Sequence, residues 1–261
     1  MRVVHFLRVL KAIEPVIVTL MLLSGTAKAD PVALDSSHII FHYHGEDTTS
    51  RLGAYVLGVG DINGDNFADI AITSHSPMGT YIFFGGNPPD STPDYFLQGG
   101  IRISGLLRYT ADTTQGILTT TDSIVYLYPR INDSLRDLPI DSIKPLPGIV
   151  NFGRYVATSY LDNDSIADVL ITASDPFQGD IAYLYKDIFA SGKFPDWAYP
   201  IIHFSHIIYG AGLVDYNGDG QEDIFLALQP YLDTIGYVAI FLGPNFGSTP
   251  DVLLGRPKEL V

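Results

Sequence analysis

A nine-residue acidic pattern occurs three times in this chain of 261 residues, and it constrains the fold more than any other feature of the sequence. The copies read DINGDNFAD from Asp61, YLDNDSIAD from Tyr160 and DYNGDGQED from Asp215. Each copy ends on an aspartate and runs directly into an apolar segment, which reads IAIT, VLIT or IFLA. Short runs of β-branched and apolar residues favour buried strands. The pattern therefore predicts a repeated unit in which an acidic loop leads into a β-strand.

The odd positions of the pattern carry oxygen-bearing side chains. Several carboxylates within one short loop repel one another unless a cation lies among them. Ca²⁺ binds hard oxygen ligands and tolerates irregular geometry, and the residue at position 7 can add its backbone carbonyl. We therefore expect a Ca²⁺ site in the first and third copies. The expected ligands are Asp61, Asn63, Asp65, Phe67 and Asp69 in the first copy and Asp215, Asn217, Asp219, Gln221 and Asp223 in the third.

The middle copy departs from the other two. Aligned on its last residue, it keeps candidate ligands at positions 3, 5, 7 and 9, which are Asp162, Asp164, Ile166 and Asp168. Position 1 is Tyr160, however, and position 4 is Asn163, where the other copies have glycine. Glycine allows the chain to turn with positive φ at little steric cost. We expect metal binding at the middle loop to be weaker than at the other two, or to be absent.

The loops allow two other interpretations. An EF-hand needs a glutamate at position 12 and helices on both sides. Position 12 is Ile72 in the first copy and Leu226 in the third, and a strand-like segment follows each loop, so the EF-hand does not fit. The second interpretation is an Asx-rich turn that binds no metal. This metal-free interpretation is less favoured for three copies with the same spacing than it would be for a single copy, because a repeated motif is less often a chance match.

Short signatures flank the loops at similar distances. A glycine preceded by an aromatic residue or leucine lies before each loop, at Leu52–Gly53, Phe152–Gly153 and Tyr209–Gly210, and a proline lies after each, at Pro77, Pro176 and Pro230. In the loops and these flanks the chain resembles the FG-GAP repeat family, of the integrin α-subunit and VCBS type. The resemblance implies a β-propeller whose loops hold Ca²⁺ in a structural role.

The spacing of the loops agrees with propeller blades. The copies start at residues 61, 160 and 215, so the first interval is about twice the second, and a degenerate repeat is expected over residues 101–150. Periods of about 40–50 residues with four strands each are typical of blades. We expect an all-β propeller with blades at about 48–100, 101–150, 151–206 and 207–257. Because FG-GAP propellers generally have seven blades, we expect a fragment of a larger propeller, with a small closed propeller and completion by another chain as alternatives.

The N-terminal residues predict secretion. Arg2, Arg8 and Lys11 precede an apolar run over residues 16–23, and the sequence Ala27-Lys28-Ala29 fits a cleavage site, which together indicate a signal peptide over residues 1–29. The run is too short to span a membrane. With 29 acidic against 15 basic residues, the net charge of −14 disfavours nucleic acid or an anionic membrane surface as a partner. The chain has no cysteine, so bound metal would take over part of the stabilising role of disulfides.

No catalytic motif is recognisable, since the sequence has no GxSxG elbow, HExxH helix or P-loop. His38, His42 and His44 would share one face of a strand and could hold Zn²⁺ or Cu²⁺, although such a face is more often simply polar. Trp197 and the tyrosines either line a binding face or fill space between blades. We expect an extracellular adhesion or interaction module that binds a protein or a glycan. A carbohydrate-binding propeller and an accessory part of a polysaccharide-degrading enzyme remain the alternatives.

Overall fold

A computed structural model describes residues 43–255, apart from residues 46–48, 99, 101, 111–114, 122, 132–133, 136–137, 163, 178, 188–194, 201–205 and 231–234. The chain divides into two units, Met1–Ile40 and Phe41–Val261, and every described residue belongs to the second. The predicted signal peptide and two of the three clustered histidines, His38 and His42, therefore lie outside the described residues. In the part of the chain that is described, no helix is long and apolar enough to cross a membrane.

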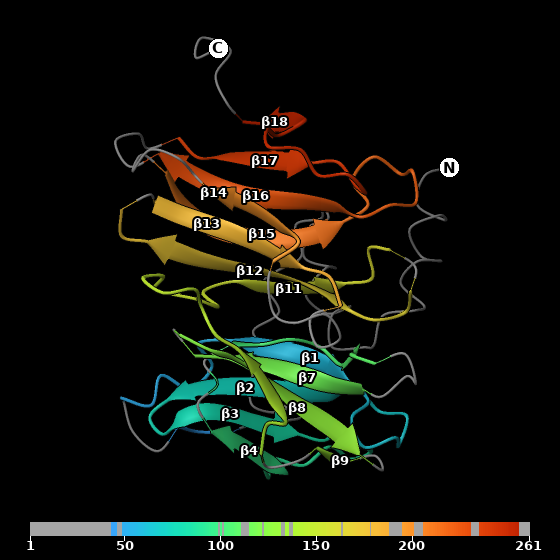
Figure 1. Ribbon diagram of the computed structural model, residues 1–261. Helices are drawn as coiled ribbons and strands as arrows, with labels where there is room; N and C mark the ends of the chain where they lie inside the picture. Colours follow the sequence, from blue (N-terminus) through green and yellow to red (C-terminus); the bar gives the residue numbers. More distant parts are fainter. Residues whose placement is uncertain are drawn as a thin grey trace, which may run out of the picture. The chain divides into compact units, whose positions relative to one another are not determined.

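The described residues form four antiparallel sheets, each built from one continuous stretch of chain, and the sheets are arranged as the blades of a four-bladed β-propeller (Figure 1). The expected all-β propeller is confirmed. Blade 1 contains β1 (Val56–Gly60), β2 (Asp69–His75), β3 (Met78–Phe83) and β4 (Tyr95–Gln98). Blade 3 contains β11 (Val156–Ser159), β12 (Asp168–Asp175), β13 (Gly179–Tyr185) and β14 (Trp197–Pro200). Blade 4 contains β15 (His206–Val214), β16 (Asp223–Pro230), β17 (Tyr237–Phe241) and β18 (Val252–Leu254).

Blade 2 is the degenerate repeat expected from the spacing of the loops. Its sheet has the path β10-β8-β7-β5, and the short strands β6 and β9 pair with β7 and β8. These strands are β5 (Arg102–Ile103), β6 (Leu107–Arg108), β7 (Gln115–Thr120), β8 (Val125–Ile131), β9 (Ser134–Leu135) and β10 (Asp141–Ile143). No acidic pattern enters β7, so this blade keeps the sheet of the repeat without its candidate metal loop.

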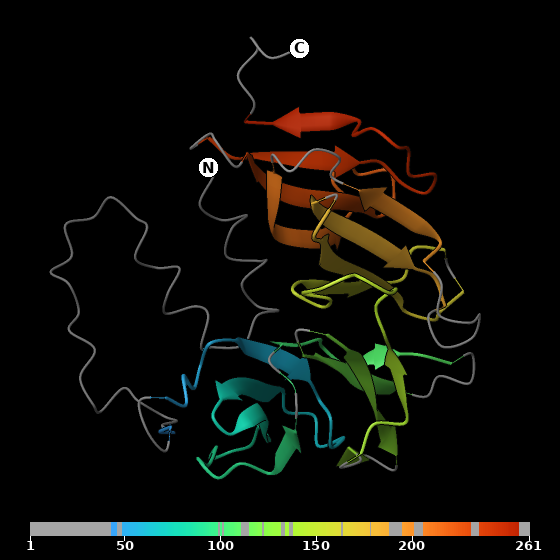
Figure 2. The same cartoon turned by 60° about the vertical axis from the view of Figure 1, so that its left-hand side comes forward.

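The hydrophobic core lies between consecutive blades. Successive side chains of a strand point to opposite faces, so a strand covered on both sides is apolar at every position. In β12, Val169 and Ile171 belong to a cluster shared with blade 2, whereas Leu170 belongs to a cluster shared with blade 4. A third cluster joins blades 1 and 2. The order of the four sheets can be followed in a second view of the chain (Figure 2).

Hydrogen bonds near the strand ends add specific links between neighbouring blades. The hydroxyl of Thr80 donates to the carbonyl of Gly100 at 3.3 Å, and that of Thr120 donates to the carbonyl of Gly153 at 3.0 Å. Between blades 3 and 4, the backbone N–H of Ile208 donates to Oδ2 of Asp180 at 2.7 Å. Such bonds to buried groups fix the relative position of two sheets more precisely than apolar contact does.

Candidate metal sites

Each acidic loop ends in a buried aspartate that is the first residue of the second strand of its blade. Asp69, Asp168 and Asp223 begin β2, β12 and β16 and are 0% exposed. In the first loop, Oδ2 of Asp69 accepts a hydrogen bond from the N–H of Ile62 at 2.6 Å, and Oδ1 accepts one from the N–H of Gly85 at 2.8 Å. The last residue of the pattern therefore joins the start of the loop to the segment that follows β3.

The third loop is built in the same way. Oδ2 of Asp223 accepts from the N–H of Tyr216 at 3.0 Å, and Oδ1 accepts from the N–H of Gly243 at 2.8 Å. Gly85 and Gly243 occupy equivalent positions, two residues after the ends of β3 and β17. A Cβ atom there would collide with the backbone oxygen of Ala68 or Glu222, so both positions favour glycine.

The first aspartate of each of these two loops organises the turn. Oδ1 of Asp61 accepts hydrogen bonds from the N–H groups of Gly64 and Asp65 at 2.6 and 3.1 Å, and Oδ2 accepts from that of Asn66 at 2.8 Å. Asp215 accepts the three corresponding bonds at 2.7, 3.2 and 3.0 Å. Desolvation of the carboxylate acts to raise the pKa of Asp61, but the three donated hydrogen bonds outweigh it, so this pKa lies below its usual value.

Positions 3, 5 and 7 also match between the two loops. Asn63 donates through Nδ2 to Oδ2 of Asp65 at 2.9 Å, and the N–H of Phe67 donates to Oδ1 of Asp65 at 2.8 Å. Asn217, Asp219 and Gln221 repeat both bonds at 2.9 and 2.8 Å. Positions 4 and 6 have positive φ in both loops, as the glycine pattern predicts: Gly64 (81°), Asn66 (70°), Gly218 (79°) and Gly220 (86°).

The described residues of the middle loop repeat part of this geometry. The N–H of Leu161 donates to Oδ2 of Asp168 at 2.6 Å, the N–H of Ile166 donates to Oδ1 of Asp164 at 2.8 Å, and Ser165 at position 6 has φ of 71°. Tyr160, at position 1, is directed to blade 2 instead. Its hydroxyl accepts a hydrogen bond from the N–H of Arg108 at 3.1 Å, and the Arg108 guanidinium lies 5.6 Å from its ring centre.

A second difference at the middle loop was not predicted from the sequence. The position equivalent to Gly85 and Gly243 is Asp187, which has a positive φ of 47°. Oδ1 of Asp168, which in the other loops accepts a hydrogen bond from a glycine N–H, is buried without a well-formed hydrogen bond, although the N–H of Asp187 still acts on this carboxylate. Burial, reinforced by the charge of Asp162, raises the pKa of Asp168 to about 7.

An aspartate that was not predicted from the sequence recurs just before the outer strands of blades 1, 3 and 4. The carboxylates of Asp94, Asp196 and Asp251 accept hydrogen bonds from the N–H groups of Phe84, Lys186 and Leu242 at 2.7, 2.7 and 2.9 Å. Each follows a proline, and this Pro-Asp pair, repeated in phase with the loops, is the signal that could have identified them. They are structural, because each joins the end of the third strand to the start of the fourth.

The loops bring their predicted ligands close together without forming a finished metal centre. Among the residues that the structure describes, no three His, Cys, Asp or Glu side chains already converge as a metal ion requires. Asp61 and Asp215 direct both carboxylate oxygens to backbone N–H groups, although each carboxylate keeps further lone pairs. The loops therefore present oxygen atoms around a turn, and side-chain rotation is needed to gather them about one point.

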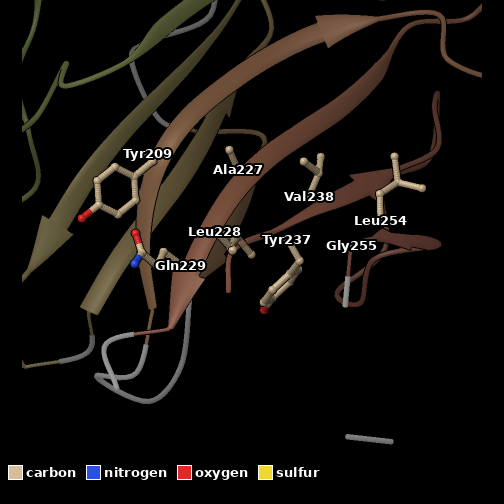
Figure 3. A pocket seen from close by; sticks show the side chains of 9 residues that line it. Tyr209, Ala227, Leu228, Gln229, Tyr237, Val238, Leu254 and Gly255 are labelled. Atoms are coloured by element: carbon tan, nitrogen blue, oxygen red, sulfur yellow. The ribbon is translucent and has the colours of Figure 1, made fainter. Parts of the chain in front are cut away.

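A shallow pocket of about 440 Å³ lies on blade 4 (Figure 3). Tyr209, Gln229 and Tyr237 contribute polar side chains to its lining, and Val238 and Leu254 contribute an apolar surface. Among the described residues that line the pocket, none has an acidic, basic or histidine side chain. Trp197, by contrast, packs against the core between blades 3 and 4 and stacks on Tyr199 with ring centres 5.9 Å apart, which agrees with the space-filling alternative.

No protein-family model matches the chain, and no curated protein matches it.

Proposed function

We propose that this chain is a secreted Ca²⁺-binding propeller of the FG-GAP class, in which the ions are structural and the propeller acts as an extracellular adhesion or interaction module. The observation that carries the proposal is the agreement between the loops at residues 61–69 and 215–223. They have different residues at positions 2, 6, 7 and 8, yet they share each hydrogen bond around the turn. The two loops therefore have a common backbone scaffold that presents carboxylate and amide oxygens. Ca²⁺ prefers oxygen ligands of these kinds.

The proposed structural role follows from where the loops lie. Each one leads directly into the second strand of its blade through a buried aspartate. An ion bound at positions 1, 3 and 5 would neutralise carboxylates that otherwise repel one another, and it would hold the exposed turn against that anchored end. Because the unfolded chain has no such arrangement, bound Ca²⁺ stabilises the fold by mass action, by about 2.7 kcal/mol for one site at 100 times its Kd.

Replacing Asp219 with alanine tests this role. The change removes a ligand from the third loop, so it should lower the melting temperature in Ca²⁺ by several degrees, on the order of 2–4 °C for each kcal/mol lost in a domain of this size. In chelator, where no ion is bound, the loss should be much smaller. Asp90→Ala is a matched control. Like Asp219, Asp90 is exposed and accepts a hydrogen bond from the backbone N–H of the residue two positions later, which is Thr92 at 2.7 Å. Equal losses for Asp219→Ala in Ca²⁺ and in chelator would contradict a metal role.

The pocket on blade 4 favours a second candidate function, carbohydrate binding. Tyr209 and Tyr237 offer flat apolar ring faces on which sugars can stack, and the Gln229 amide in the lining of the same pocket can hydrogen-bond sugar hydroxyls.

A glycan array measures this second candidate. If the pocket binds sugars, Tyr209→Ala should remove array binding while leaving the melting temperature nearly unchanged, since the Tyr209 side chain is 51% exposed. Tyr216→Ala is the control, because Tyr216 is similarly exposed at 49% and does not line the pocket. An array without any signal for the unchanged protein would leave protein partners as the object of the search.

A further inference from the structure

We propose that the pocket on blade 4 binds acidic oligosaccharides built from uronic acids, and that Arg154, two residues before β11 in blade 3, binds their carboxylate group. The inference rests on carbohydrate binding, the second candidate function, and it names the class of sugar that the pocket prefers. It also gives a role to a cluster of arginine and tyrosine side chains that lies outside the acidic loops.

Tyr209 belongs both to the pocket and to this cluster. It is 51% exposed and lines the pocket together with Gln229 and Tyr237 (Figure 3). The guanidinium carbon of Arg154 lies 6.0 Å from the centre of the Tyr209 ring and 5.7 Å from that of the Tyr155 ring. Arg154 does not line the pocket itself, so a ligand must extend past the ring of Tyr209 to reach it. A sugar that stacks on this ring and has a carboxylate at its edge meets that requirement.

The Arg154 guanidinium has donors to offer to a ligand. Within the described part of the chain it donates no hydrogen bond, and its ion pair with Oδ2 of Asp180 is long, at 3.9 Å. The Asp180 carboxylate is held instead by the Ser174 hydroxyl and the Ile208 N–H, both at 2.7 Å. Packing on a ring occupies the flat face of a guanidinium and leaves the N–H groups in its plane for a carboxylate. The Arg154 side chain is 35% exposed, so a ligand can approach these groups.

A second guanidinium group lies beside the first, in a chain whose net charge is −14. Arg102 lies 5.1 Å from the ring centre of Tyr155, the ring that Arg154 also contacts. None of the described residues that line the pocket is acidic. A carboxylate ligand therefore meets positive charge next to Tyr209 and no competing carboxylate in the described lining of the pocket.

The acidic loops lie at the other end of the first strands. Tyr209 is the fourth residue of β15, and the loop at residues 215–223 follows the end of that strand. At about 3.3 Å per residue, the six residues from Tyr209 to Asp215 span roughly 20 Å. Salt screens exposed charges over about 8 Å at physiological ionic strength, so the loop carboxylates contribute little repulsion to an anion bound at Arg154.

An array of paired glycans tests the inference. The probes are oligosaccharides of galacturonate, glucuronate and mannuronate, each printed beside its methyl ester, which keeps the sugar ring and removes the charge. With Ca²⁺ at a fixed concentration, the full chain should bind at least one acid form about tenfold or more tightly than its ester, as titration calorimetry on that pair measures. Added salt should weaken binding of the acid form and leave the ester unaffected, since it screens the contact with Arg154.

Arg154→Gln isolates the contribution of the arginine. It should reduce the affinity for the acid form to that for the ester and leave ester binding unchanged, which also shows that the variant is folded. Tyr209→Ala should remove binding of both forms. Arg108→Gln is the matched control, because Arg108 is also half-buried and also packs on a tyrosine, 5.6 Å from the ring centre of Tyr160. This control should bind both forms like the unchanged protein.

The outcomes separate the inference from the function on which it rests. Acid-selective binding that Arg154→Gln abolishes supports both. Equal binding of acid forms and esters, or acid selectivity that survives in Arg154→Gln, overturns the inference and leaves carbohydrate binding in place. No binding of any glycan by the unchanged protein overturns both. Should Arg154→Gln lose its near-UV circular dichroism, the unchanged protein decides, because an acid preference that added salt does not reduce contradicts an ionic contact.

Discussion

Replacing Asp223 with alanine should lower the free energy of unfolding in chelator by about 2–5 kcal/mol, because it leaves two donors in the protein interior without an acceptor. Asp223 is 0% exposed and accepts hydrogen bonds from Tyr216 at 3.0 Å and from Gly243 at 2.8 Å. The two donors lie on opposite sides of the sheet end, so the change also releases the loop from the segment after β17. Urea unfolding in the presence of chelator measures the loss without any contribution from Ca²⁺.

Asp168→Ala is the matched control for this prediction. Asp168 is buried to the same extent, but it has one such bond, from the N–H of Leu161 at 2.6 Å, and its Oδ1 has no well-formed hydrogen bond. Burial also raises the pKa of Asp168, so near neutral pH its removal relieves part of a desolvation cost. The loss should therefore be smaller than for Asp223→Ala. A loss at Asp168 that equals or exceeds the loss at Asp223 would mean that these hydrogen bonds do not anchor the loops.

The sequence allowed the repeated part of the fold to be predicted in some detail. The nine-residue pattern places its last aspartate at the first residue of β2, β12 and β16, as the following apolar segments indicate. The sequence STPD occurs at residues 91–94 and again at 248–251, in each case just before the last strand of a sheet, β4 or β18. Blade 2 was expected from spacing alone. Its extra short strands β6 and β9 could not be predicted, because two-residue strands depend on their neighbours in space rather than on local propensity.

The candidate sites were predicted only as far as the pattern extends along the chain. The two complete loops repeat one set of hydrogen bonds because the same residue types recur at fixed spacing. Asp187 escaped notice because it lies 19 residues beyond Asp168, across the whole β12–β13 hairpin. The contact between Tyr160 and Arg108 joins residues 52 positions apart in different blades. Local spacing contains no information about either pairing.

The core between blades 3 and 4 should be sensitive to a loss of side-chain volume. Leu170 in β12 is 0% exposed and belongs to the cluster that contains Leu184 of blade 3 and Leu226 and Phe241 of blade 4. Leu170→Ala removes three carbon atoms from a close-packed region and leaves a cavity, so we expect a loss of about 2–5 kcal/mol in the free energy of unfolding. Urea unfolding in saturating Ca²⁺ measures this loss while the occupancy of the loops is the same in both proteins.

Val56→Ala provides the comparison for that measurement. Val56 lies in β1 with 62% of its surface exposed, so its truncation should change the free energy of unfolding by no more than about 0.5 kcal/mol.

Leu170 contacts blade 4, whereas its neighbour Ile171 contacts blade 2, so the same measurement on Ile171→Ala separates two interfaces of one strand. A single unfolding transition for both variants would mean that the blades unfold together. Separate transitions would mean that each interface contributes its stability independently, as in repeat proteins whose units contact only their neighbours. A loss at Leu170 as small as that at Val56 would contradict the packing of blade 4 on blade 3.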